Sequence, residues 1–334
     1  MTSPRISRVH PLAGVEGGRV TIFGEDLCTM DLGQVSPQFD TAESRPLIAA
    51  PGKMIVPIPE GAASGFLRVA WPDGVFQGPF FEVAEKLADE LHPVANPVVD
   101  GEGRVITTFS GSRGQAAPTG VSVFRISAGG DVEPYISDLL NPTALALDAE
   151  GTLFISCRND GTIRKLTGPG QTEVFADGLG IATGIAFSAH GTLFVGDRAG
   201  GIYAVEPQGS VRRFAKLPAS VAAYHLAFGP DGDLYVTAPT LSNDDPIFQI
   251  GPTGAVARYF EHLARPQGLA FDRDGNLFVV AIHGGERGIF RIARDGSASL
   301  AVAGENLVGL AFDPRGRMVI ASTNTIYRLG WTGS

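Results

Sequence analysis

The stretch PQGLAFDRDGNLFVVA, Pro266–Ala281, carries the pattern that decides the fold. It joins one short apolar run to a second through a turn that contains Asp and Gly, which is the sequence form of a β-hairpin. The same pattern occurs at five other places in the chain. They begin at Asn96, Pro142, Ala182, Ala223 and Leu307, and they read NPVVDGEGRVITTFS, PTALALDAEGTLFIS, ATGIAFSAHGTLFVGD, AYHLAFGPDGDLYVTA and LVGLAFDPRGRMVIAS.

The turn glycines of these segments give the period of the repeat. They are Gly103, Gly151, Gly191, Gly232, Gly275 and Gly316, separated by 48, 40, 41, 43 and 41 residues. A period of about 40–45 residues is typical of the four-stranded blade of a β-propeller. Two more alternating apolar runs follow each hairpin, which leaves no room for helices. The sequence therefore predicts an all-β chain with a six-bladed β-propeller over residues 85–334.

The last repeat lacks one strand. After Leu307 the chain supplies three strands before Ser334, so its blade would keep an open edge. Residues 84–91 precede the first inner strand, at the place where every other repeat has an outermost strand. We therefore expect residues 84–91 to complete the last blade, so that the ring closes by pairing its two ends.

Residues 96–329 resemble NHL-repeat propellers and the related gluconolactonase or senescence-marker superfamily. The resemblance is carried by the pattern x-G-[LI]-A-[FL]-D-x-x-G-x-[LM]-[FVY]-[VI] in the segments quoted above. It indicates the fold and leaves the activity open, because this scaffold is shared by lactonases, lyases and proteins that only bind a ligand.

Residues 1–84 lack the repeat. The stretch PRISRVHPLAGVEGGRVTIFGEDL, Pro4–Leu27, resembles the opening of an IPT/TIG domain, which is a small immunoglobulin-like β-sandwich. Runs beginning at Met54, Gly65 and Phe80 fit its remaining strands. Phe66, Val69 and Trp71 are expected to build its core. Such modules act as spacers or contact surfaces, so a protein partner could bind here.

Composition and charge restrict the partners. The 44 glycines and 23 prolines favour turn-rich β structure, and 26 basic against 35 acidic residues give a net charge of −9. A nucleic-acid partner is not expected, because phosphate binding needs a basic surface. The chain shows no signal-peptide pattern and no apolar run long enough for a membrane helix. We expect no membrane partner and a cytoplasmic location as given, or an extracytoplasmic one if a leader has been removed.

One position in each repeat is predicted to lie at the mouth of the central channel. This position follows the outermost strand of the preceding blade and begins the next inner strand. Asn96, Thr143, Thr183, His225, Gln267 and Val308 occupy it. The polar members are candidate ligand-binding residues, together with Arg113 in the longer loop Ser110–Gly120.

The gluconolactonase resemblance implies a divalent-metal site, calcium or zinc, built from a Glu, an Asn and an Asp. Only Asn96 matches such a ligand, and Asp197 is the nearest acidic side chain. A hard cation prefers several charged oxygen ligands, so this neutral ring departs from the enzyme pattern. An aspartate at a strand end is also more often a turn partner. Asn243, Asp244 and Asp245 are spaced unlike a calcium loop.

His225 and His283 are the candidates for acid–base chemistry, with Asp197 as a third catalytic candidate. A lone histidine in a neutral ring is more often a structural residue. The leading hypothesis is therefore a binding protein that uses the channel mouth for a small polar ligand or a peptide. The alternatives are a metal-dependent lactone hydrolase that uses Asn96, Asp197 and His225, and an interaction scaffold that docks a partner through residues 1–84.

Overall fold

The computed structural model describes residues 4–27, 34–72, 74–109 and 120–330. Their regular structure is β-strand with no α-helix, so none of these residues belongs to a helix that could cross a membrane. The prediction of an all-β chain is confirmed. The chain forms two compact units. Unit 1 contains the chain up to Glu85 with Gly284–Arg291 and Ala298–Asn306, and unit 2 contains the rest.

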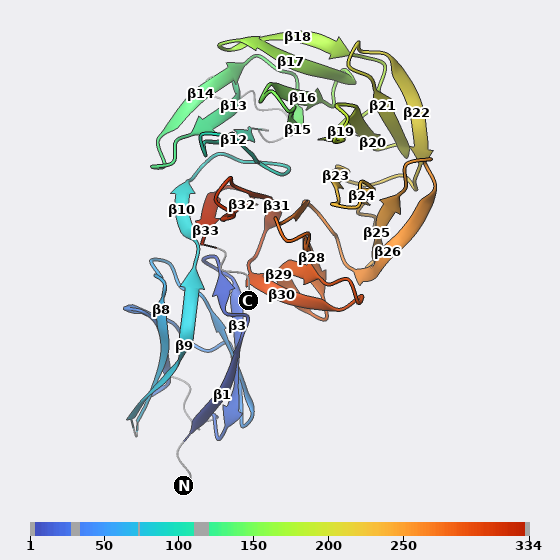
Figure 1. Cartoon of the computed structure of the whole chain (residues 1–334). Helices are drawn as coiled ribbons and strands as arrows, with labels where there is room; N and C mark the ends of the chain where they lie inside the picture. Colours follow the sequence, from blue (N-terminus) through green and yellow to red (C-terminus); the bar gives the residue numbers. More distant parts are fainter. Residues whose placement is uncertain (1–3, 28–33, 73, 110–119, 331–334) are drawn as a thin grey trace. The chain divides into compact units, whose positions relative to one another are not determined.

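Unit 2 consists of antiparallel sheets that follow one another along the chain (Figure 1). In four of these sheets, the strands are hydrogen-bonded in the order in which they occur in the sequence. The four-stranded sheets are β11 (Val98–Val99), β12 (Val105–Thr108), β13 (Val121–Ile126) and β14 (Val132–Ser137); β15 (Pro142–Leu147), β16 (Leu153–Cys157), β17 (Thr162–Gly168) and β18 (Gln171–Ala176); β19 (Ala182–Phe187), β20 (Leu193–Asp197), β21 (Gly201–Val205) and β22 (Val211–Lys216); and β23 (His225–Phe228), β24 (Leu234–Thr237), β25 (Asp245–Ile250) and β26 (Val256–Leu263).

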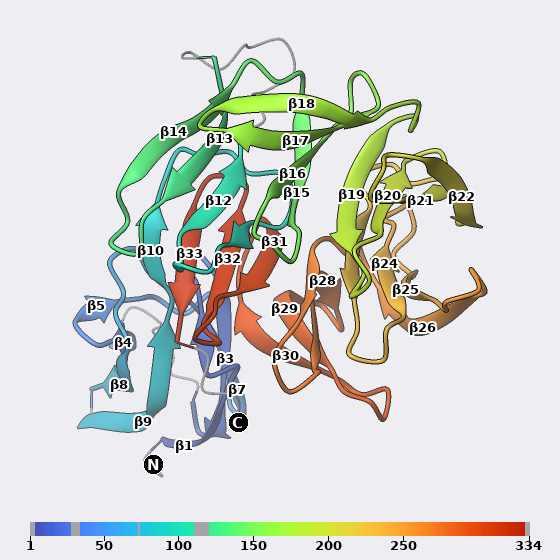
Figure 2. The ribbon, with the colours of Figure 1, turned by 45° about the horizontal axis from the view of Figure 1, so that its top comes forward.

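Two more inner hairpins complete the arrangement. They are β27 (Leu269–Phe271) with β28 (Leu277–His283), and β31 (Leu307–Phe312) with β32 (Met318–Ser322). The inner strands contact one another in the cyclic order β11, β15, β19, β23, β27, β31 and back to β11. Figure 2 shows these sheets from a second direction. A closed ring of antiparallel sheets is a β-propeller.

The repeated turn has a physical explanation. Asp100 Oδ1 accepts the backbone N–H groups of Glu102 and Arg104 at 3.0 and 2.9 Å, and Asp313 Oδ1 accepts those of Arg315 and Arg317 at 2.8 and 2.9 Å. The turn then needs a residue with positive φ, which glycine adopts without strain. Gly103 has φ 80° and Gly316 has φ 82°. The Asp and Gly that mark the repeat in the sequence therefore form one hydrogen-bonded turn.

The segment before the first repeat supplies an edge strand. Strand β10 (Glu85–Ala88) lies beside β33 (Ile326–Leu329) in a sheet of order β10-β33-β32-β31. Leu87 and Leu91 are buried in one apolar cluster with Val105 and Ile126. The carboxylate of Asp89 accepts hydrogen bonds from Asn324 and Thr325 at 2.6 and 2.7 Å. The hydrogen bond from Thr325 is the main cause that lowers the pKa of Asp89.

Unit 1 contains two sheets around one apolar core. The first has the order β1 (Arg5–His10), β3 (Arg19–Glu25), β7 (Lys53–Pro57) and β6 (Ile48–Ala50). The second includes, in this hydrogen-bonded order, β29 (Glu286–Ile292), β30 (Ala298–Ala303), β2 (Ala13–Gly14), β9 (Gly74–Val83), β8 (Gly65–Trp71), β4 (Ser36–Phe39) and β5 (Ala42–Glu43). Strand β2 pairs in parallel with both β9 and β30.

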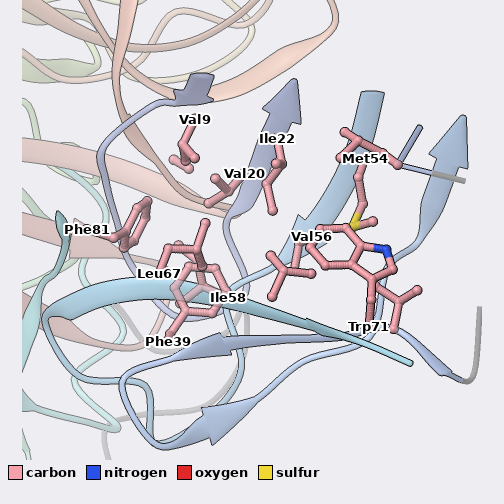
Figure 3. Packing of buried hydrophobic residues seen from close by; sticks show 14 residues of the cluster. Val9, Val20, Ile22, Phe39, Met54, Val56, Ile58, Leu67, Trp71 and Phe81 are labelled. Carbon is pink, nitrogen blue, oxygen red and sulfur yellow. The ribbon is translucent and has the colours of Figure 1, made fainter. Parts of the chain in front are cut away.

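The core of unit 1 follows the two-residue period of its strands (Figure 3). On β8, Leu67, Val69 and Trp71 are buried. The expectation that Phe66 belongs to this core is wrong, because successive strand side chains point to opposite faces and Phe66 has the opposite parity. Phe66 is half exposed and packs against Phe80 on the paired strand, with the ring centroids 5.8 Å apart.

Candidate ligand-binding channel

The inner strands of unit 2 enclose a cavity of about 290 Å³. Five inner strands each contribute one alanine to the lining: β15, β19, β23, β27 and β31. This alanine is the middle residue of a repeated Leu-Ala-Phe, Ile-Ala-Phe or Leu-Ala-Leu pattern. These residues are Ala146, Ala186, Ala227, Ala270 and Ala311. A methyl group at this position leaves room along the axis, whereas a larger side chain would fill it. The alanine of the repeat is therefore the signal in the sequence that indicates the cavity. The prediction of ligand-binding residues from the sequence did not use this alanine.

Most of the side chains that line this cavity are apolar. Beyond the alanines it contains larger apolar side chains such as Phe228, Phe271 and Phe312. Asn96 and His225 are the two lining residues with polar side chains among the described part of the chain. Ligand sites are commonly apolar with a few placed polar groups, and this cavity has that character.

Asn96 is engaged by the backbone of two other strands. Its Nδ2 donates to the carbonyl of Leu269 at 2.9 Å, and its Oδ1 accepts the N–H of Leu310 at 3.1 Å. Gly268 makes this approach possible, since a Cβ there would collide with Asn96 Oδ1. The side chain thus links β27 and β31, and the oxygen that would bind a metal already accepts a hydrogen bond.

His225 is different, because one of its ring nitrogens has no partner. The side chain begins β23 and is 3% exposed, and its Nε2 is buried without a hydrogen bond. Burial lowers the pKa of His225 to about 4, against the opposing effect of Gln267. The imidazole is therefore neutral at pH 7.

In a neutral imidazole one ring nitrogen carries the proton and the other accepts a hydrogen bond, so the unpartnered Nε2 of His225 is an acceptor in the tautomer protonated on Nδ1. The backbone of Gln267 is held at the same time: its N–H donates to the carbonyl of Val280 at 2.8 Å, and its carbonyl accepts Thr237 Oγ1 at 2.6 Å. The structure thus provides one buried imidazole nitrogen without a hydrogen-bond partner, on a residue that lines the cavity.

Of the two predicted threonines, Thr183 links neighbouring repeats, whereas Thr143 makes a local hydrogen bond. Thr183 Oγ1 donates to the carbonyl of Gly196 at 3.1 Å and accepts the N–H of Tyr224 at 3.0 Å, which belongs to the next repeat. Thr143 Oγ1 donates to the carbonyl of Asn141 at 3.3 Å. Neither threonine lines the cavity, and neither does Gln267 or Val308. Arg113 lies outside the described residues.

The catalytic candidates do not meet at this cavity. Asp197 Oδ1 accepts the backbone N–H groups of Ile181 and Ala199 at 2.9 and 3.1 Å, so it stabilises a turn. His283 Nδ1 lies 2.8 Å from the carbonyl oxygen of His262. Only His225 among the three lines the cavity.

The described residues contain no group of three or more His, Cys, Asp or Glu side chains able to hold a metal ion. Asp244 and Asp245, at the start of β25, have partners of their own. Asp245 accepts the N–H and the hydroxyl of Thr240 at 3.0 and 2.6 Å, and Asp244 accepts the N–H of His262 at 2.9 Å.

Comparison with known proteins supports the fold. No protein-family model matches the chain, and no curated protein matches it. An auxiliary nutrient binding protein from Bacteroides thetaiotaomicron is 13% identical, with 99% of this chain and 98% of that chain covered and a TM-score of 0.55. A gluconolactonase from Xanthomonas campestris is 18% identical, with 73% and 88% covered and a TM-score of 0.58.

A virginiamycin B lyase from Staphylococcus aureus is 14% identical, with 71% of this chain and 94% of that chain covered and a TM-score of 0.51. At these identities the similarity shows the fold and carries no activity. The chain is thus similar to gluconolactonase-like and lyase propellers, and over its full length to a nutrient-binding protein.

Proposed function

We propose that this chain is a binding protein that takes up a small molecule in the channel of a six-bladed, NHL- or gluconolactonase-like propeller. The observation that carries the proposal is a cavity whose lining side chains are mostly apolar and include His225, which has a buried Nε2 without a hydrogen-bond partner. Leaving such a group without a hydrogen bond costs about 1–3 kcal/mol, which a ligand with one N–H or O–H donor would recover. The ligand is therefore mainly apolar with a single donor.

The size of the cavity narrows the class of ligand further. About 290 Å³ is at the lower end of the range for small-molecule sites. A compact molecule of about one ring, or one side chain of a peptide, suits this volume. The polar ligand expected from the sequence fits less well, because the lining has only two polar side chains in the described part of the chain, His225 and the already engaged amide of Asn96.

Phenol and anisole test this proposal directly, because they have similar shapes and only phenol donates a hydrogen bond. Calorimetric titration of the full chain should show that phenol binds about tenfold more tightly than anisole, as expected for one hydrogen bond of ~1.4 kcal/mol. His225→Phe should remove this preference. Ala227→Leu should abolish binding of both by filling the cavity. If the wild-type chain binds neither compound, or if Ala227→Leu binds them unchanged, channel binding is refuted.

The similarity to a gluconolactonase suggests an alternative function, that of a metal-dependent lactone hydrolase. It would need calcium or zinc at Asn96 and Asp197, whose oxygens already accept backbone hydrogen bonds. Metal analysis of the purified protein with a lactone-hydrolysis assay decides between the two functions. Stoichiometric metal with turnover that Asn96→Ala abolishes would overturn the binding proposal.

For the N-terminal part we propose an IPT/TIG-like immunoglobulin fold that serves as a contact surface for a protein partner. The two sheets around the shared core of unit 1 support it. Exchange of Phe66 and Phe80 for serine on the exposed face of β8 and β9 should weaken capture of such a partner, whereas the same exchange at exposed Val256 in unit 2 should not.

A further inference from the structure

Arg198 connects two neighbouring repeats of unit 2. It directly follows β20 and begins the loop to β21. Its backbone N–H donates to the carbonyl of Ile181 at 3.2 Å, and its Nη2 donates to the carbonyl of Val221 at 2.7 Å. Ile181 and Val221 lie in the loops that precede the inner strands β19 and β23. The guanidinium is therefore held at the loops that lead into these two inner strands.

The charge of Arg198 has no ion-pair partner in the part of the chain that the structure describes. The side chain is half-buried, and its Nε is buried without a hydrogen-bond partner. The carboxylate of the adjacent Asp197 is engaged by the backbone, since its Oδ1 accepts the N–H groups of Ile181 and Ala199. Charged groups that are removed from water are normally paired with an opposite charge. Arg198 is thus a cation that can take an anionic partner from outside the chain.

The bond to Val221 fixes the guanidinium and leaves donors for a ligand. A guanidinium carries five N–H donors in a planar fork. Arg198 uses one of them, on Nη2, among the described residues. The two N–H groups of Nη1 and the second N–H of Nη2 remain. Such a fork matches the two oxygens of a carboxylate, and hydrogen bonds between charged groups are stronger than neutral ones.

The other repeats show that folding does not require an arginine at this position. The position lies seven residues after the turn glycine of each repeat. Its occupants in the other repeats are Ser110, Arg158, Pro239, Ile282 and Thr323. Since four of these five residues are uncharged, the strand and the loop form without a cation. The charge of Arg198 is a feature of this repeat beyond what the fold needs.

Exposed apolar side chains surround this cation. Ile181 and Val221, whose carbonyls bind Arg198, are 43% and 49% exposed. The N–H of Val221 donates in turn to the carbonyl of Pro239 at 3.0 Å, and Leu241, two residues further along that loop, is 91% exposed. The backbone hydrogen bonds thus connect the three loops that carry these side chains. Apolar side chains grouped on a surface are typical of a site that contacts a partner.

We propose that Arg198, Ile181, Val221 and Leu241 form a docking site for the C-terminus of a peptide or protein whose last residue is apolar. The terminal carboxylate pairs with the guanidinium, and the last side chain packs against the three apolar residues. A C-terminal residue carries both groups on one carbon atom, which matches a single unpaired cation beside apolar side chains. None of these four residues lines the channel cavity, so the site does not rest on the channel function proposed above.

Fluorescence anisotropy with the full chain tests the site. The probes are labelled five-residue peptides that end in Leu, Ile or Phe, each with a free C-terminal carboxylate or with a C-terminal amide. At least one free acid should bind saturably, about tenfold more tightly than its amide, as expected for one charge-assisted hydrogen bond. Arg198→Gln should remove this preference. Leu241→Ser should weaken binding of the acid about fivefold and keep the preference over the amide.

Two exposed positions on β22 provide matched controls. Arg213→Gln changes the net charge as Arg198→Gln does, and Val211→Ser matches Leu241→Ser. Both should leave the dissociation constant unchanged. Leu241→Ser alters an exposed side chain, so its melting temperature should match that of the wild-type chain. The proposal is refuted if no free acid binds saturably, or if Arg213→Gln weakens binding as much as Arg198→Gln does. Equal binding of acid and amide would assign the surface to an internal peptide segment and would also overturn it.

Discussion

Mild acid should destabilise the propeller through His225. The side chain is buried, and its pKa falls from 6.5 to about 4 on folding. The unfolded chain therefore binds this proton more tightly than the folded chain. The stabilising effect of the neutral ring is complete above about pH 6.5, and it is lost as the pH falls from there toward 4.

The size of the effect follows from the two pKa values. Each unit of difference corresponds to ~1.4 kcal/mol, so protonation costs about 3 kcal/mol in full. Proton linkage at about pH 5 gives a loss of about 2 kcal/mol relative to neutral pH. This is a substantial fraction of the ~5–15 kcal/mol by which folded proteins are stable.

Urea unfolding, followed by circular dichroism at neutral pH and at about pH 5, measures this loss. His225→Gln keeps a polar side chain that does not titrate, so this variant should lose about 2 kcal/mol less than the wild-type chain over the same interval. The other titratable groups contribute equally to the loss of stability in both proteins, so their contributions cancel in the difference. His190→Gln, at an exposed turn, is the matched control and should follow the wild-type profile. Equal losses in the wild-type chain and His225→Gln would refute the reasoning.

Three substitutions test the contacts that close the ring, with urea midpoints as the measurement. Ser156→Ala removes the buried hydroxyl that donates to the carbonyl of Thr183 and should cost about 1–3 kcal/mol; an unchanged midpoint would show that this bond contributes nothing. Gly184→Ala would drive a methyl group into the carbonyl of Tyr224 and should cost about 1–3 kcal/mol, whereas wild-type stability would mean that the neighbouring strand shifts freely. Leu91→Ala should cost about 2–5 kcal/mol because the side chain is buried in the cluster beside β10; a negligible loss would contradict a stabilising role for this segment.

Local pattern predicted the strands well, because each hairpin is defined by residues close in the sequence. The spacing from Asp272 to Gly275 is enough to form the turn, since the donors and acceptors are at most four residues apart. Alternation along β8 would also have placed Phe66 on the exposed face. The expectation for Phe66 was wrong because it used the hydrophobicity of the side chain and ignored the alternation of side chains along the strand.

The repeat in the sequence by itself determined that the chain is all-β and a propeller, and it supplied one candidate position close to the start of each inner strand. Only the tertiary structure decided which of those side chains is available to a ligand. The amide of Asn96 is engaged by Leu269 and Leu310, which lie 173 and 214 residues away, while Nε2 of His225 is left without a partner. Hydrogen bonds over such separations depend on how neighbouring sheets pack, and no local pattern records them.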